Sequence, residues 1–144
     1  MPLGDPMGGD SDYQNKGKIT RVWMTCIPVS DLATALFFYS EVLGLEIALD
    51  ERSRNWVELG PAEPMGKIAL YVPSKFDKRQ PGGPTGVIFE TNSIYELHRR
   101  LVDEGVKFIM KPQRQEWGGL MAILTDPDGN ELCVVEDPEH YTRR

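Results

Sequence analysis

The chain contains two copies of one short pattern, and this repeat constrains the fold more than any other feature. In each copy an apolar, strand-like run is followed by a helical run, a terminating glycine and a new apolar run. The first copy occupies residues 24–47 and the second residues 86–108. Aligning Asp31 with Ser93 brings the two strands into register, which indicates a duplicated unit of supersecondary structure. We expect the functional site to lie between the two copies.

The elements of the first copy follow from hydrophobic spacing and capping residues. Residues 19–29 are rich in β-forming side chains and predict a strand. Asp31 predicts the start of a helix, because its carboxylate can accept hydrogen bonds from the free amides of the first turn. Apolar residues at helical spacing predict that this helix continues to Gly44. Further strands are expected at residues 45–50, 55–59 and 68–72.

The second copy repeats this order. Residues 85–91 predict a strand, and Ser93 with Glu96 predicts a capping box at the start of the second helix. An Asp-rich and Gly-rich turn at residues 126–130 is expected between the last two strands. We interpret this turn as structural, because it lacks the length and the distal glutamate of an EF-hand calcium loop. The closing strands are expected at residues 106–110, 120–125 and 131–135.

These elements predict an α+β fold with two βαβββ modules. The parts of the chain are a flexible lead, a first module, a linker rich in proline and glycine, a second module and a charged tail. They cover residues 1–17, 18–72, 73–84, 85–137 and 138–144, respectively. A chain of 144 residues is long enough to form a stable hydrophobic core without a disulfide or a structural metal.

Composition excludes several classes of protein. The net charge is −6 and the basic residues are scattered, whereas binding to nucleic acid needs a clustered basic surface. The apolar runs are far shorter than the ~20 residues that cross a membrane. Two cysteines are too few for a disulfide framework. We therefore predict a soluble, cytoplasmic protein that binds neither nucleic acid nor membranes.

Several short motifs, in the same order along the chain, resemble the vicinal-oxygen-chelate superfamily of glyoxalases, bleomycin resistance proteins and extradiol dioxygenases. The matching segments are Val-Ser-Asp-Leu at 29–32, Phe-Tyr at 38–39, Leu-Gly-Leu at 43–45, Phe-Glu at 89–90, Glu-Gly-Val at 104–106, Gln-Glu-Trp-Gly at 115–118 and Asp-Pro-Asp-Gly-Asn at 126–130. The resemblance covers residues 18–137. It implies two βαβββ modules whose curved sheets enclose a cavity, and commonly a homodimer.

The same resemblance implies where a metal would be bound in metal-dependent relatives. Four strand positions that face the cavity would carry the ligands, and here they hold Met24, Ala69, Gly86 and Cys133. None of these residues offers the imidazole or carboxylate that divalent first-row metals prefer. His98, on the second helix, and His140, in the tail, are predicted to be surface residues that do not complete such a site. We expect no bound metal and no cofactor.

Strand alternation predicts which side chains line the cavity instead. The candidates for ligand binding are Met24, Cys26, Trp56 (or its neighbour Val57), Gly86, Ile88, Trp117 and Cys133. This set is apolar, aromatic and sulfur-bearing, which is the usual composition of a small-molecule site. Ordinary core packing is the alternative interpretation of the same residues.

Three carboxylates, Glu58, Glu90 and Glu131, are the candidates for acid–base catalysis near the cavity. An apolar cavity disfavours the ionised form of a carboxyl group and would raise its pKa towards a catalytic range. The alternative is that these residues lie at ordinary, solvated strand ends. Cys26 and Cys133 are expected to be inert thiols, because no base is predicted beside them.

The sequence leaves three classes of function open. The favoured class is a metal-free protein, similar to the bleomycin resistance members, that holds a planar or aromatic organic molecule between its modules. The second is an enzyme of the same superfamily, a lyase, isomerase or dioxygenase acting on a small oxygenated substrate. The third is a structural dimer whose cavity is filled by its own side chains. A homodimer is expected in each case.

Overall fold

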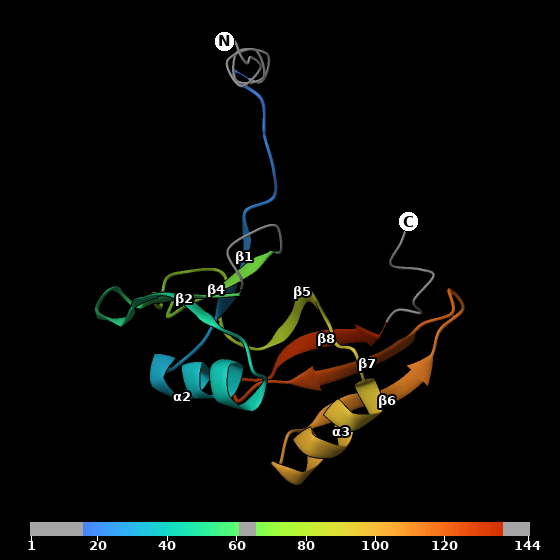
Figure 1. Cartoon of the computed structure of the whole chain (residues 1–144). Helices are drawn as coiled ribbons and strands as arrows, with labels where there is room; N and C mark the ends of the chain where they lie inside the picture. The colour runs from blue at the N-terminus through green and yellow to red at the C-terminus, as the bar shows by residue number, and fades with distance from the viewer. Residues whose placement is uncertain (1–15, 61–65, 137–144) are drawn as a thin grey trace.

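The computed structural model of the chain describes residues 16–60 and 66–136, which form two four-stranded sheets (Figure 1). The first sheet has the order β1-β4-β3-β2, with β1 (Met24–Pro28), β2 (Ile47–Glu51), β3 (Trp56–Leu59) and β4 (Lys67–Tyr71). The second has the order β5-β8-β7-β6, with β5 (Gly83–Glu90), β6 (Phe108–Arg114), β7 (Leu120–Thr125) and β8 (Asn130–Glu136). β1 runs parallel to its neighbour β4, and β5 runs parallel to its neighbour β8. The other neighbouring strands are antiparallel. The predicted α+β fold of two βαβββ modules is confirmed.

Each module carries one main helix. In module 1, which contains β1 to β4, helix α2 (Leu32–Leu36) continues as the π-helical segment η1 (Phe37–Val42). Asp31 caps α2 as predicted, since its Oδ2 accepts a hydrogen bond from the Thr34 amide at 2.9 Å. In module 2, which contains β5 to β8, the helix is α3 (Ile94–Asp103). A short 3₁₀ segment, η2 (Arg52–Arg54), connects β2 with β3.

The start of α3 differs from the predicted capping box. Ser93 occupies the N-cap position but makes no side-chain bond there. The Ile94 amide donates instead to Glu136 Oε1 at 2.6 Å, and Glu96 pairs with Arg99 at 2.6 Å. Because the cap is supplied by β8, 42 residues further along the chain, no local motif indicates it.

Two strand boundaries also differ from expectation. The strand predicted from residue 19 begins only at Met24, which pairs with Lys67, the first residue of β4. Trp23 is accordingly exposed. β6 runs past the predicted end at residue 110 and contains Pro112. It tolerates this proline because it is an edge strand with a register shift between residues 110 and 113.

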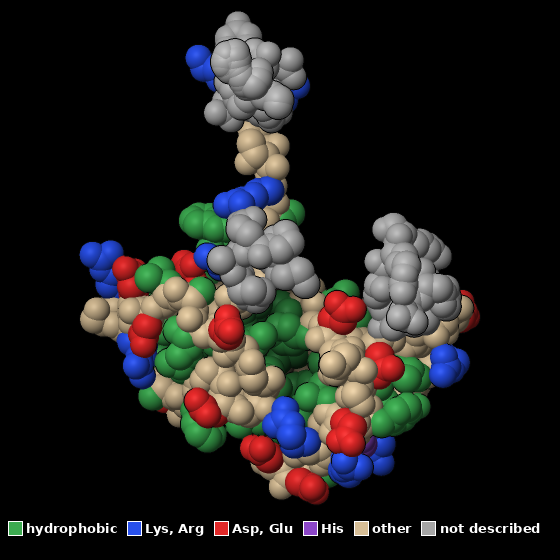
Figure 2. Space-filling model, viewed as in Figure 1, with side chains coloured by type: hydrophobic (Ala, Val, Ile, Leu, Met, Phe, Trp, Pro, Cys, Tyr) green, Lys and Arg blue, Asp and Glu red, His purple; other side chains and the backbone are tan. Residues whose placement is uncertain are grey.

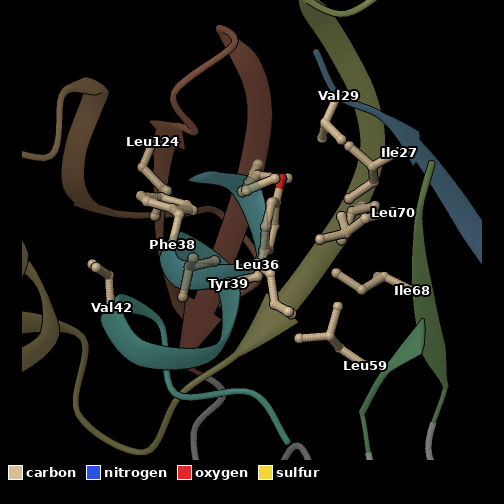
Figure 3. Close-up of a cluster of buried hydrophobic side chains, with 14 of the residues drawn as sticks. Ile27, Val29, Leu36, Phe38, Tyr39, Val42, Leu59, Ile68, Leu70 and Leu124 are labelled. Carbon is tan, nitrogen blue, oxygen red and sulfur yellow. The ribbon is translucent and has the colours of Figure 1, made fainter. Parts of the chain in front are cut away.

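The hydrophobic core lies on the helix side of both sheets (Figure 3). Side chains from α2 and η1 pack against the first sheet and reach Leu124 of the second sheet. The labelled members of the cluster in Figure 3 are Ile27, Val29, Leu36, Phe38, Tyr39, Val42, Leu59, Ile68, Leu70 and Leu124. One core therefore joins the two modules.

A buried polar cluster reinforces this junction, and we call it the inter-module latch: Tyr39, Asp126 and Asn130. Tyr39 is fully buried and its hydroxyl donates to Asp126 Oδ2 at 2.8 Å. Asn130 Nδ2 donates to the same oxygen at 2.8 Å and to the Pro28 carbonyl at 2.9 Å. Burial, followed by the Asp126 charge, raises the pKa of Tyr39 far above its usual range. The acidic turn at 126–130 is thus a structural element that connects the modules.

The two helices lie on the same side of the molecule, below the sheets in the view of Figure 1. The opposite face of each sheet has no helix of the described chain upon it.

Neither helix in residues 16–60 and 66–136 is long and apolar enough to cross a membrane. Residues 1–15 of the predicted lead, residue 137 and the whole predicted tail (138–144), which contains His140, lie outside the described residues.

Candidate functional site

The face of the first sheet turned away from its helix is the open face of module 1. The side chains on the other face, Ile27, Val57, Leu59, Ile68 and Leu70, are buried in the core. By alternation the open face carries the intervening residues, which are Met24, Cys26, Trp56, Glu58, Lys67, Ala69 and Tyr71. The cross-strand pairs Cys26 with Ala69 and Ala69 with Glu58 place three of them in one row. Of the alternatives Trp56 and Val57, it is Trp56 that faces the candidate site.

A charged network occupies the centre of this face. Glu58 is only 8% exposed, and its Oε2 accepts a hydrogen bond from Trp56 Nε1 at 2.9 Å. Its Oε1 lies 3.4 Å from the Lys67 ammonium. The Trp56 ring lies 6.4 Å from the Tyr71 ring. Glu58 is therefore a buried, paired carboxylate, and the alternative interpretation as an ordinary solvated strand end does not hold for this residue.

Cys26 lies beside this network. Burial raises the pKa of the Cys26 thiol, the Arg79 guanidinium opposes that rise and the Glu58 carboxylate adds to it. Arg79 Nη1 also donates to the Cys26 carbonyl at 2.5 Å. Sequence reasoning missed Arg79 because it lies in the linker, 53 residues from its partner, and no motif spacing relates the two.

The open face of module 2 has a different character. Its central row runs across the sheet through the paired residues Ile88, Cys133, Ile123 and Met110. The neighbouring row contains Glu90, Val135, Met121 and Gln113. Ile88 is 66% exposed, and burial raises the pKa of the Cys133 thiol. Both cysteines are free. The central row is thus aliphatic and sulfur-bearing, with no charged group.

The remaining candidate carboxylates lie away from the central row. Glu131 is half-buried and pairs with Thr125 at one end of β8. Glu90, in the neighbouring row of the open face, is exposed, and it also borders a small pocket of about 110 Å³. The other residues around that pocket are Leu43, Leu45, Phe89, Thr91, Leu97, Leu124 and Val134. Glu58 and Glu131 therefore belong to different open faces, and the described chain does not bring the three carboxylates together.

Gly86 adopts a backbone conformation that favours glycine. It lies at φ +80° within an irregular stretch of β5 between Pro84 and Ile88. A Cβ at this position would meet nothing within 4 Å. Thr85 stabilises the irregularity by donating its hydroxyl to the Glu131 carbonyl at 2.7 Å. This bulge interrupts the strand alternation from which Gly86 was assigned to the wall of the site.

Trp117 lies in the hairpin that connects β6 with β7. The Gln115 amide donates to the Gly119 carbonyl at 2.8 Å and closes this hairpin. The Trp117 ring packs directly on Gly119, so that a Cβ at Gly119 would overlap the indole. The hairpin extends from the Arg114–Leu120 pair, which lies at one end of the sheet beyond the central row. Trp117 is thus held by its own hairpin and is not part of the central row.

The strand register changes the residues that would surround a metal ion. Ala69 pairs with Cys26 and not with Met24, and Cys133 pairs with Ile88 and not with Gly86. Burial raises the pKa of both thiols and so disfavours the thiolate, which is the form that binds a metal. Residues 16–60 and 66–136 contain no group of three or more His, Cys, Asp or Glu side chains that could hold a metal. The residues at these positions do not fit a divalent metal.

His98 differs from the prediction of a surface residue. Its ring lies edge-on to Phe108, with 4.6 Å between the ring centroids. Its Nε2 is buried, without a hydrogen-bond partner in the described residues. It belongs to the packing between α3 and β6, on the opposite side of the sheet from the open face.

Comparisons with known proteins agree on one family. A sequence model of the Glyoxalase/Bleomycin resistance protein/Dioxygenase superfamily matches residues 21–134. A crystal structure of a member of that superfamily from Sphaerobacter thermophilus has 36% sequence identity and a TM-score of 0.74, and the match covers 83% of this chain and 98% of that one. The crystal structure of TnmS3, an antibiotic binding protein from Streptomyces sp. CB03234, has 27% identity and a TM-score of 0.72, with the same coverage of 83% and 98%. The uncharacterized protein YetH of Bacillus subtilis is 26% identical over 121 residues, which are 82% of this chain and 99% of YetH.

Proposed function

This chain belongs to the glyoxalase/bleomycin resistance protein/dioxygenase superfamily, and from that premise we propose that it binds a small planar organic molecule on its open faces without a metal ion. The observation that carries the proposal is the pair of cross-strand neighbours at the centre of each face. Module 1 has Cys26 beside Ala69, and module 2 has Ile88 beside Cys133. Such positions offer apolar and sulfur-bearing surface but neither the imidazole nor the carboxylate that divalent first-row metals prefer.

Two further observations support a binding role. Hydrophobic side chains gather at the centre of the view in Figure 2, where the surface is hollowed between the modules, and acidic side chains flank them. TnmS3, which has a similar fold, is an antibiotic binding protein. A site that combines an apolar wall with a few polar groups is typical of proteins that bind small organic molecules.

We also propose that a second copy of the chain closes the site. Ile88, on the open face of module 2, is 66% exposed although its neighbours across the strand are apolar. β1 and β5 are edge strands of their sheets, and exposed edges and apolar patches are commonly covered by another chain. A symmetric dimer would cover both open faces with one type of contact.

An enzyme acting on a small oxygenated substrate is the alternative function. It would need a base directed at the reacting atom, whereas both oxygens of Glu58 already have partners in Trp56 and Lys67. Catalysis would then depend on Glu90 or Glu131. If Glu90→Gln or Glu131→Gln abolished turnover of a bound substrate while leaving its binding intact, the enzyme would be favoured.

The binding proposal is tested with a neutral fluorescent probe, N-phenyl-1-naphthylamine, and a matched pair of variants. Ile123→Lys places a charge in the central row of module 2, and Val102→Lys places the same charge on an exposed position of α3. We expect the probe to bind the wild-type protein and Val102→Lys equally, and Ile123→Lys at least about tenfold more weakly, because a buried charge opposes binding of an apolar ring. Equal binding to all three proteins would contradict the proposed site.

The metal-free and dimeric states are tested on the same preparations. Elemental analysis is expected to find no stoichiometric Zn, Ni, Fe or Mn, and sedimentation is expected to give twice the 16.3 kDa mass of the chain. One metal ion per chain that is lost in Glu58→Gln would overturn the first expectation. A monomer at micromolar concentration would overturn the second.

A further inference from the structure

The linker between the modules holds an arginine in a defined position beside the open face of module 1. Gln80 Nε2 donates to the carbonyls of Ser74 and Asp77, at 3.0 and 2.8 Å. The backbone amide of Arg79 donates to Asp77 Oδ1 at 3.0 Å. Three hydrogen bonds within a few residues give this loop a definite shape, and Arg79 extends from it.

The guanidinium of Arg79 reaches the site itself. Its Nη1 donates to the carbonyl of Cys26 in β1. The Arg79 charge also acts on the Cys26 thiol, as does the Glu58 carboxylate. Arg79 therefore lies at the β1 edge of the open face, close enough to the Cys26 thiol to act on it together with Glu58 of the central network.

The charges of Arg79, Glu58 and Lys67 do not sum to zero. Glu58 is matched by Lys67, and its second oxygen is occupied by Trp56. Within residues 16–60 and 66–136 the Arg79 guanidinium has the Cys26 carbonyl as its hydrogen-bond acceptor and pairs with no carboxylate. A guanidinium carries five N–H donors in a planar fork, so most of its donors are available to a bound molecule. One positive charge thus remains at the site of a protein whose net charge is −6.

We propose that Arg79 recognises the ligand of this site and that this ligand is a planar aromatic molecule with an anionic oxygen, such as a carboxylate. The inference rests on the proposed binding function. The partly exposed side chains of Met24, Cys26 and Trp56 on the same open face provide contact area for the ring, and Arg79 pairs with the charge. Arginine is suited to this role, because its fork forms two parallel hydrogen bonds with a carboxylate and is more weakly hydrated than an ammonium group.

The test compares two ligands that have the same ring and differ in charge, 2-naphthoate and 2-naphthamide, as competitors of N-phenyl-1-naphthylamine. The proteins are the wild type, Arg79→Gln, Arg79→Lys and the control Arg99→Gln, which removes an exposed arginine from α3. We expect 2-naphthoate to bind the wild-type protein at least about tenfold more tightly than 2-naphthamide, the range for hydrogen bonds to charged groups. Arg79→Gln should abolish this preference by weakening 2-naphthoate alone, Arg79→Lys should retain part of it, and Arg99→Gln should retain all of it.

The outcomes separate this inference from the proposed function. If the neutral probe binds but the two naphthalenes compete equally, or if Arg79→Gln leaves the preference unchanged, the assignment of Arg79 is wrong and the binding function stands. If neither the probe nor either naphthalene binds, both proposals fail. If Arg79→Gln converts a dimer into monomers, Arg79 serves a contact between chains and the assignment is overturned as well.

Discussion

The two modules share one topology but use their buried polar residues in opposite ways. In module 2 the buried Asp126 and Asn130 face the core side and bond to Tyr39 and Pro28 of module 1. In module 1 the buried polar residue is Glu58, which lies on the open face with Trp56 and Lys67. The latch is surrounded by protein, whereas the Glu58 network borders the face that we assign to ligand binding.

This difference shows how a duplicated unit acquires separate tasks. A buried polar group must be paired in either place, because an unpaired one costs about 1–3 kcal/mol. In the latch this pairing connects two modules, so its loss should lower the stability of the whole chain. On the open face the pairing arranges charges around a site, so its loss should change recognition more than stability. Each of the following variants tests one side of this comparison.

The largest effect is expected from Asp126→Ala in the latch. The Asp126 carboxylate accepts four hydrogen bonds, from the Tyr39 hydroxyl, the Asn130 side chain and the amides of Asp128 and Asn130. Removing it leaves buried donors unpaired and should lower the free energy of unfolding by about 3–5 kcal/mol, measured by urea denaturation. Tyr39→Phe removes one of these donors and should cost about 1–2 kcal/mol. A loss below 1 kcal/mol for Asp126→Ala would contradict the assigned role of the latch.

A smaller loss of stability is expected from Gly119→Ala in module 2. The new methyl group would overlap the Trp117 ring, so the hairpin or the indole must shift, at a cost of about 1–3 kcal/mol. The control is Gly66→Ala in module 1, where a Cβ meets nothing within 4 Å and should change stability by less than about 0.5 kcal/mol. Thermal denaturation together with near-UV circular dichroism of the tryptophans checks both. If the two variants were equally stable, the packing of Trp117 on Gly119 would be wrong.

On the open face, Glu58→Gln should affect binding and stability in opposite directions. The amide oxygen can still accept from Trp56, while the ion pair with Lys67 is lost, so we expect a cost of only about 1 kcal/mol. Removing a negative charge near Arg79 should strengthen the binding of 2-naphthoate by about two- to fivefold, and leave 2-naphthamide unchanged. Competition titrations and urea denaturation measure the two effects. A loss of stability as large as that of Asp126→Ala would remove the distinction between the modules.

The smallest expected effect distinguishes the two thiols. Burial raises the pKa of Cys26 and of Cys133, so at pH 8 both should react with iodoacetamide more slowly than a free thiol. Arg79 counteracts the rise at Cys26, so Arg79→Gln should raise the pKa of Cys26 further and slow its alkylation about two- to fivefold. Peptide mass spectrometry follows each site, and Cys133 is the internal control. Equal changes at both cysteines would show that Arg79 does not act on Cys26 specifically.

Much of the fold followed from local sequence patterns. The repeat predicted two βαβββ modules, and Asp31 predicted the start of the first helix, because a cap and its amide are close along the chain. The α3 cap was predicted wrongly, since Glu136 of β8 replaces the expected local bond of Ser93. Strand alternation agrees with the face observed for Cys26, Trp56 and Glu58 in module 1, whereas the bulge in β5 interrupts the alternation at Gly86.

The sequence alone determined the duplicated architecture and the structural nature of the acidic turn. These properties depend on residue type and on spacing within one strand, helix or turn. Only the tertiary structure decided that Cys26 pairs with Ala69, that Glu58 is buried with Lys67 and that Arg79 reaches the open face. Such contacts depend on strand register and on the path of the linker, which are set by packing between segments far apart in the chain.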